Sequence, residues 1–176
     1  MERKAKSSSN LFVKECIVSA LLRLIYEKPL TAITISELCS RAGVSRMAFY
    51  RNYTSKEDIF AKELGELFEK YKQNDEHLPK AGIYYDKKHM VHYFSYLYTY
   101  REFLAGLHHC GFGILFLEML NQYILTEWQG VSDPYTLTAF SGSLYNFFLY
   151  WSADNYSETA ELLAERLEHI FQPAVP

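Results

Sequence analysis

The stretch 31–58, TAITISELCSRAGVSRMAFYRNYTSKED, constrains the fold more than any other part of the chain, because helix-start signals follow each other closely in it. Thr34 is followed three residues later by Glu37, the pattern of a capping box, and Ser45 is suited to cap a second helix. Gly43 lies between them and tolerates the positive φ that often follows a helix. Two short helices joined by a glycine-containing turn indicate a helix-turn-helix.

The second helix of this motif carries basic and aromatic side chains and no carboxylate. Ser45, Arg46 and Met47 occupy its first turn, the part that enters the major groove in a helix-turn-helix. Arg46 is suited to bond guanine, and Met47 to pack on a thymine methyl group. Residues 1–62 carry a net charge of +5 and residues 63–176 carry −8, which favours DNA binding by the first part. A helical hairpin buried in a larger bundle is the alternative.

The same stretch resembles the TetR family of one-component transcriptional regulators. The resemblance rests on TISEL at 34–38, AGVS at 42–45, the Phe49-Tyr50 pair with Tyr53, and SKEDI at 55–59. It implies that Thr34, Tyr50 and Lys56 contact DNA phosphates, which fix the register and carry no base code. Arg51 is equally suited to a phosphate contact and to a solvated surface. Ala48 departs from the family, which commonly has a hydroxyl residue there.

The rest of the chain shows helical periodicity and no strand pattern, so we expect an all-α fold of about nine helices. The expected parts are a three-helix DNA-binding domain at 1–54, a linking helix at 55–72 and a helical bundle at 73–176. The linking helix starts either at Thr54 with Glu57 or at Ser55 with Asp58. Further helices are expected at about 88–108, 112–128, 134–153 (with Pro134 at its start) and 158–171 (with Ser157 as its cap), and a basic tail at 1–9.

The C-terminal bundle is expected to bind a small hydrophobic or aromatic effector. Aromatic side chains are dense between residues 84 and 103, and a buried tyrosine needs a partner for its hydroxyl, which suits a partly polar cavity. For any single tyrosine, ordinary packing is the alternative. The candidate lining residues are Tyr93, Tyr96, Tyr100, Phe103, Phe116 and Tyr145.

The last two helices are apolar around much of their circumference, so each needs cover on more than one side. A homodimer through residues 134–171 would supply that cover, and the family resemblance implies the same. The C-terminal half also resembles, more weakly, the regulatory domain of one TetR subgroup. The expected function is therefore a ligand-responsive repressor that binds a palindromic operator. The alternative is a helical ligand-binding or adaptor protein that has lost operator reading.

No catalytic motif is visible, and we expect neither an enzyme nor a bound cofactor. His89 and His92 are spaced to share a metal on a helix, but the closed ligand sets of structural zinc are missing, so no metal site is expected. The cysteines Cys16, Cys39 and Cys110 suit free thiols. No signal peptide or long apolar run is visible, so we expect a cytoplasmic protein without membrane contact.

Overall fold

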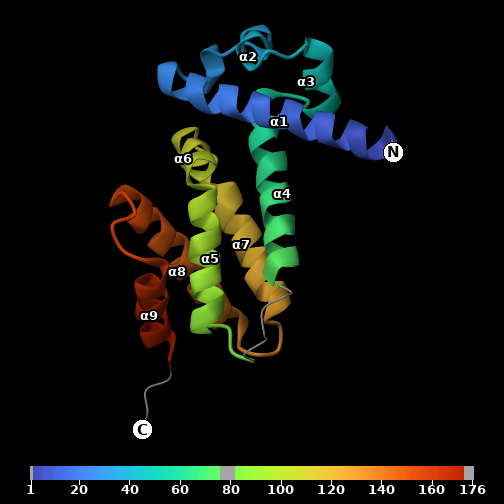
Figure 1. Cartoon of the computed structure of the whole chain (residues 1–176). Helices are drawn as coiled ribbons and strands as arrows, with labels where there is room; N and C mark the ends of the chain where they lie inside the picture. Colours follow the sequence, from blue (N-terminus) through green and yellow to red (C-terminus); the bar gives the residue numbers. More distant parts are fainter. Residues whose placement is uncertain (1, 76–81, 173–176) are drawn as a thin grey trace. The chain divides into compact units, whose positions relative to one another are not determined.

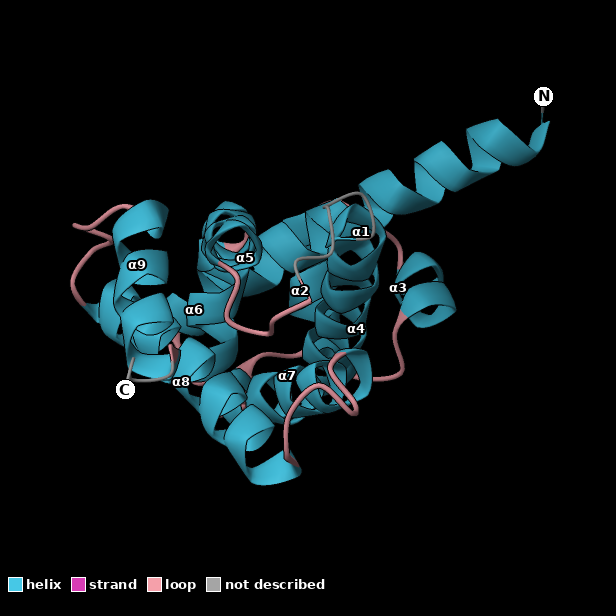
Figure 2. Cartoon of the chain, turned by 90° about the horizontal axis from the view of Figure 1, so that it is seen from below, coloured by secondary structure: helices cyan, strands magenta, loops and turns pink. Residues whose placement is uncertain are grey.

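The computed structural model describes residues 2–75 and 82–172, which form nine α-helices and one 3-10 helix and no strand (Figures 1 and 2). The all-α fold is therefore confirmed. In chain order the elements are α1 (Glu2–Glu27), η1 (Leu30–Ala32), α2 (Ile35–Ala42), α3 (Arg46–Asn52), α4 (Lys56–Asp75), α5 (Lys87–Thr99), α6 (Arg101–His109), α7 (Gly113–Glu127), α8 (Pro134–Ala153) and α9 (Ala160–Phe171). None of the helices in the described part of the chain is long and apolar enough to cross a membrane.

The chain divides into two compact units. Unit 1 contains residues 1–65 and 106–112, and unit 2 contains residues 66–105 and 113–176. The two helices α4 and α6 therefore each continue from one unit into the other. This arrangement makes them the two continuous helical connections between the units.

Unit 1 is built on α1, which packs against α2 and α3. These helices and the start of α4 contribute fully buried apolar side chains to one core, so their apolar faces cover each other. Its fully buried members include Ile17, Leu21 and Leu24 of α1, Leu38 of α2, Phe49 of α3 and Phe60 of α4.

Unit 2 is a bundle in which α5 packs on α9 and α7 packs on α8. Aromatic rings fill much of its interior. Phe116 of α7 lies edge-on to Phe148 of α8, and Phe94 of α5 lies edge-on to Trp151, with ring centroids 5.8 and 6.0 Å apart. Edge-to-face contacts of this kind contribute about 0.5–1.5 kcal/mol of stability beyond that from the area that the rings bury.

Three expected boundaries were wrong. The α1 helix begins at Glu2 rather than after a tail at 1–9, because the segment is rich in good helix formers. The expected helix at 88–108 is two helices, since α5 ends at Thr99 with Tyr100 as its C-cap and α6 begins at Arg101. Thr159, not Ser157, caps α9 by accepting from the Leu162 amide, because Ser157 lies in the preceding turn and donates to Asp154.

Candidate nucleic-acid interface

The turn between α2 and α3 has the geometry that its sequence predicts. Gly43 has a φ of +67°, and its amide donates to Ser40 O at 3.2 Å. The Val44 amide donates to Cys39 O at 3.0 Å, which completes a Schellman motif. These two hydrogen bonds fix the end of α2 locally, so α3 leaves the turn in one defined direction.

Side-chain caps fix the starts of α2 and α3, as predicted. The Thr34 hydroxyl accepts from the Glu37 amide at 3.1 Å, and the Ser45 hydroxyl accepts from the Ala48 amide at 3.1 Å. Each cap satisfies a backbone donor that the first turn of a helix leaves without a partner.

Opposite faces of α3 differ sharply in exposure. Phe49 and the adjoining Tyr53 are 0 % and 1 % exposed, and the Tyr53 hydroxyl donates to Glu63 at 2.5 Å. Met47 is 75 % exposed and Tyr50 is 50 % exposed. The buried ring of Phe49 therefore anchors the helix and meets the Tyr50 ring edge-on at 5.3 Å, while Met47 and the rest of the Tyr50 side chain are open to solvent.

The two arginines of α3 differ from the cations of unit 1 that are held by carboxylates. Arg41 makes two hydrogen bonds to Glu27, at 2.8 and 3.0 Å, and this contact lowers the pKa of the Glu27 carboxyl. The other ion pairs of this kind are Lys14–Glu63, Lys28–Glu37 and Lys62–Asp58. By contrast, Arg46 and Arg51 are exposed and form no ion pair with any described side chain. Their charge is available to an external anion.

Lys56 lies at the start of α4 with its ammonium group already engaged. It donates to Ile33 O at 2.7 Å and to Thr31 O at 3.3 Å. These bonds tie the start of α4 to the segment that enters α2. An ammonium group has three donors, so one remains for a further acceptor.

The structure also decides between the two possible starts of α4. The Ser55 hydroxyl accepts from the Asp58 amide at 3.1 Å, and Asp58 in turn accepts from the Thr54 amide at 2.7 Å. That backbone hydrogen bond is the main reason why the pKa of Asp58 lies below its ordinary value. The capping pair is therefore Ser55 with Asp58.

Sequence reasoning missed that residues 106–112 belong to unit 1. The His109 ring nitrogen Nε2 lies 3.1 Å from Ile25 O, and the His109 ring lies 4.8 Å from that of Tyr26. The Phe112 ring lies 5.3 Å from the Phe60 ring. No local pattern could show these contacts, because they join residues far apart in the chain.

The aromatic residues proposed to line an effector cavity have different surroundings. Tyr93 lines a cavity of unit 2. Tyr96 donates its hydroxyl to Leu67 O at 2.9 Å, and Tyr145 donates to Gly113 O at 3.3 Å. Phe116 is fully buried, Tyr100 packs on the Tyr96 ring at 5.0 Å, and Phe103 is 8 % exposed. The described residues hold no group of three or more metal-ligating side chains.

Two helices joined by a tight turn, with an exposed basic face on the second, define a helix-turn-helix DNA-binding protein. Residues 17–62 match the family described as "Bacterial regulatory proteins, tetR family". Residues 17–62 therefore form a tetR-type DNA-binding domain. This fold with its helix-turn-helix implies DNA-binding transcriptional regulation. No curated protein matches the sequence.

Solved structures resemble the chain over nearly its full length. A Listeria innocua protein has 14 % identity and a TM-score of 0.71, with 91 % of this chain and 89 % of that chain covered. A TetR transcriptional regulator from Streptococcus agalactiae has 18 % identity and a TM-score of 0.65, with 97 % and 99 % covered. The regulator FadR from Bacillus subtilis, solved with stearoyl-CoA, has 14 % identity and a TM-score of 0.57, with 92 % and 99 % covered. These likenesses establish the tetR-type fold.

Proposed function

We propose that this protein is a homodimeric repressor that binds a palindromic operator and leaves it when an effector occupies unit 2. The observation that carries the proposal is the outer face of α3. Arg46 and Arg51 are exposed there without a carboxylate partner among the described side chains, beside exposed Met47 and Tyr50. A cationic helix face of this kind suits phosphates and base edges.

The DNA contact proposed for each residue is based on its position in the helix-turn-helix. Arg46 and Met47, with Ser45, lie on the first turn of α3 and are proposed to read bases. Tyr50 and Arg51 lie further along the helix and are proposed to contact phosphates, as is Thr34 at the start of α2. Lys56 is proposed to offer its remaining ammonium donor to a phosphate while its other bonds hold α4 in register.

Dimerisation is proposed through α8 and α9, within residues 134–171. Tyr135 and Tyr150 of α8 are 88 % and 79 % exposed, and Ile170 of α9 is 59 % exposed. Between them, a methyl group added at Gly142 would meet no atom within 4 Å. Ala139, Gly142, Ser143 and Asn146 form a small-residue strip along α8, and such a strip beside exposed large side chains suits a helix of a second copy.

The parts of the chain are proposed to act as follows: residues 1–54 bind DNA, the helix at 55–72 links the two parts, and residues 73–176 dimerise and bind the effector, with Phe68 and Lys72 of the linking helix also lining the effector cavity. Effector binding is also suggested by the stearoyl-CoA complex of the Bacillus subtilis regulator. A coupling of about 1–3 kcal/mol between effector and operator would change operator affinity by about 5–150-fold.

Mobility-shift titration against the promoter of the protein's own gene tests the proposal. We expect the full chain to bind that duplex more tightly than a scrambled duplex of equal length at moderate salt. Equal affinity for the two duplexes would contradict operator reading. No binding to either duplex would favour the adaptor function instead.

A further inference from the structure

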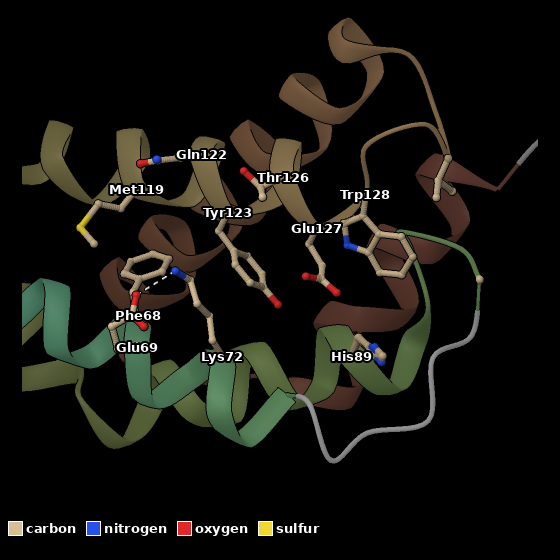
Figure 3. A pocket seen from close by; sticks show the side chains of 12 residues that line it. Phe68, Glu69, Lys72, His89, Met119, Gln122, Tyr123, Thr126, Glu127 and Trp128 are labelled. Atoms are coloured by element: carbon tan, nitrogen blue, oxygen red, sulfur yellow. Dashed lines mark hydrogen bonds and ion pairs between the residues drawn. The ribbon is translucent and has the colours of Figure 1, made fainter.

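Unit 2 contains a cavity of about 700 Å³ between α4, α5, α7 and the turn after α7. Figure 3 shows Phe68 and Met119 towards one end, His89 and Trp128 at the other, and Tyr123 and Glu127 between them. Cavities of roughly 300–1,000 Å³ are typical of small-molecule sites. The walls are largely apolar or aromatic, so the cavity is suited to an apolar molecular body.

A second cavity of about 30 Å³, here called the inner cavity, adjoins the first. His89, Tyr123 and Trp128 line both cavities, while Tyr93 lines the inner one. Its volume is enough for one small polar group. The larger cavity therefore has room for an apolar body beside Phe68, Met119 and Trp128, and the smaller one adds the polar atoms of His89 and Tyr93.

Two side chains at this inner end, His89 and Tyr93, carry buried polar atoms without a hydrogen-bond partner. The Tyr93 side chain is 4 % exposed and its hydroxyl makes no hydrogen bond, and the buried Nδ1 and Nε2 atoms of His89 make none either. His89 and Tyr93 are four residues apart on α5, so they share one face of the helix. Buried polar groups are normally hydrogen-bonded, so these atoms are suited to bind a group that enters the cavity.

The charges that line the larger cavity disfavour an anion. Lys72 is its one lysine or arginine among the described residues, and its ammonium lies 2.8 Å from the Glu69 carboxylate. Glu127 adds a second carboxylate. A phosphate or sulfonate inside this cavity would meet two carboxylates and one ammonium group, and that ammonium group is already paired with Glu69.

We propose that the effector of this protein is an uncharged amphiphile with an apolar, preferably aromatic body and one hydrogen-bonding group. The body lies between Phe68, Met119 and Trp128, and the polar group enters the inner cavity and bonds His89 or Tyr93. This inference rests on the proposed function, because it names the chemistry of the effector that the regulator would sense.

Two fluorescent probes with the same skeleton test the charge preference. N-phenylnaphthylamine is uncharged and has one N–H donor, and anilinonaphthalene sulfonate adds an anionic group to the same rings. Titration of the full chain is expected to show saturable binding of the uncharged probe, and at least about tenfold weaker binding of the sulfonate. Absence of saturable binding of the uncharged probe, or equal affinity for the two, would overturn the proposal.

Conservative variants test the site itself. Tyr93→Phe and His89→Phe each remove a polar group without emptying the cavity, and each should weaken binding of the uncharged probe about threefold. The double variant should weaken it about tenfold, the size expected for one hydrogen bond. Tyr98→Phe is the matched control, because Tyr98 lies on the same helix and is 40 % exposed outside both cavities.

The thermal stability of Tyr93→Phe distinguishes a ligand-binding role of the Tyr93 hydroxyl from a structural one. Tyr93→Phe removes a hydroxyl that has no partner, so its thermal midpoint without probe should not fall below that of the wild type. An unchanged probe affinity in the double variant would overturn the proposal. Promoter binding is measured in parallel to separate the two claims. A protein that binds the promoter but not the uncharged probe contradicts the effector inference alone. A protein that binds the probe but not the promoter contradicts the proposed function alone.

Discussion

Arg46 is the side chain on which sequence preference should depend most. It lies exposed on the first turn of α3 with no carboxylate partner among the described residues, whereas Arg41 is held by Glu27. Arg46→Ala should therefore cost about 1–3 kcal/mol of operator binding and relax the preference at one base pair. Mobility-shift titrations on the operator and on single-base variants measure both effects. Arg41→Ala is the control, and an Arg46→Ala loss that is equal on operator and random DNA would exclude base reading.

Lys56 is expected to act on both folding and DNA binding. Its bonds to Ile33 O and Thr31 O hold the start of α4, and each such bond contributes about 0.5–1.5 kcal/mol. Lys56→Met should lower the free energy of unfolding and weaken binding to all duplexes alike, with a salt slope flatter by about one unit. Urea unfolding and salt titrations measure the two effects separately. An unchanged salt slope would mean that Lys56 has a structural role only.

The starts of α2 and α3 and the turn between them were predictable because their causes are local. Thr34, Ser45 and Gly43 are each specified within four residues of themselves, and all three have the predicted geometry. The inclusion of Gly106–Phe112 in unit 1 was not predictable, since it depends on contacts with α1 and α4. The inner end of the cavity was also missed, because nothing in the sequence distinguishes Tyr93, without a hydroxyl partner, from Tyr96, which has one.

Two glycines should respond oppositely to a larger side chain. A Cβ at Gly106 of α6 would lie 2.5 Å from Leu22 Cδ2 and 3.0 Å from Ile25 Cδ1 of α1, whereas one at Gly65 of α4 would meet nothing within 4 Å. Gly106→Leu should therefore destabilise the protein by about 1–3 kcal/mol through overpacking. Gly65→Ala should stabilise it by about 0.8–1 kcal/mol, the difference in helix propensity. Urea unfolding of both variants is the measurement, and an equal response would show that α6 does not approach α1 closely.

Dimerisation of the whole molecule should depend on the small-residue strip of α8. Gly142→Trp places a large ring where a methyl group would meet no atom of its own chain, so the monomer should fold while its partner is held away. Obligate interfaces of this kind bury roughly 2,000 Å² or more in total. Light scattering at low micromolar concentration should give the mass of a dimer for the wild type and 20.6 kDa for the variant. Gly65→Trp, at an equally open helical position, should remain dimeric.

Footprinting of the protein on its own promoter tests most directly whether two copies of the chain read one operator. If each copy places α3 in the major groove, hydroxyl-radical cleavage should show two symmetric protected segments. Their centres should lie about 34–36 Å apart along the duplex, which is one helical turn. The footprint should be lost with Gly142→Trp and weakened with Arg46→Ala. A single protected segment, or uniform protection without a boundary, would contradict a dimer that reads a palindrome.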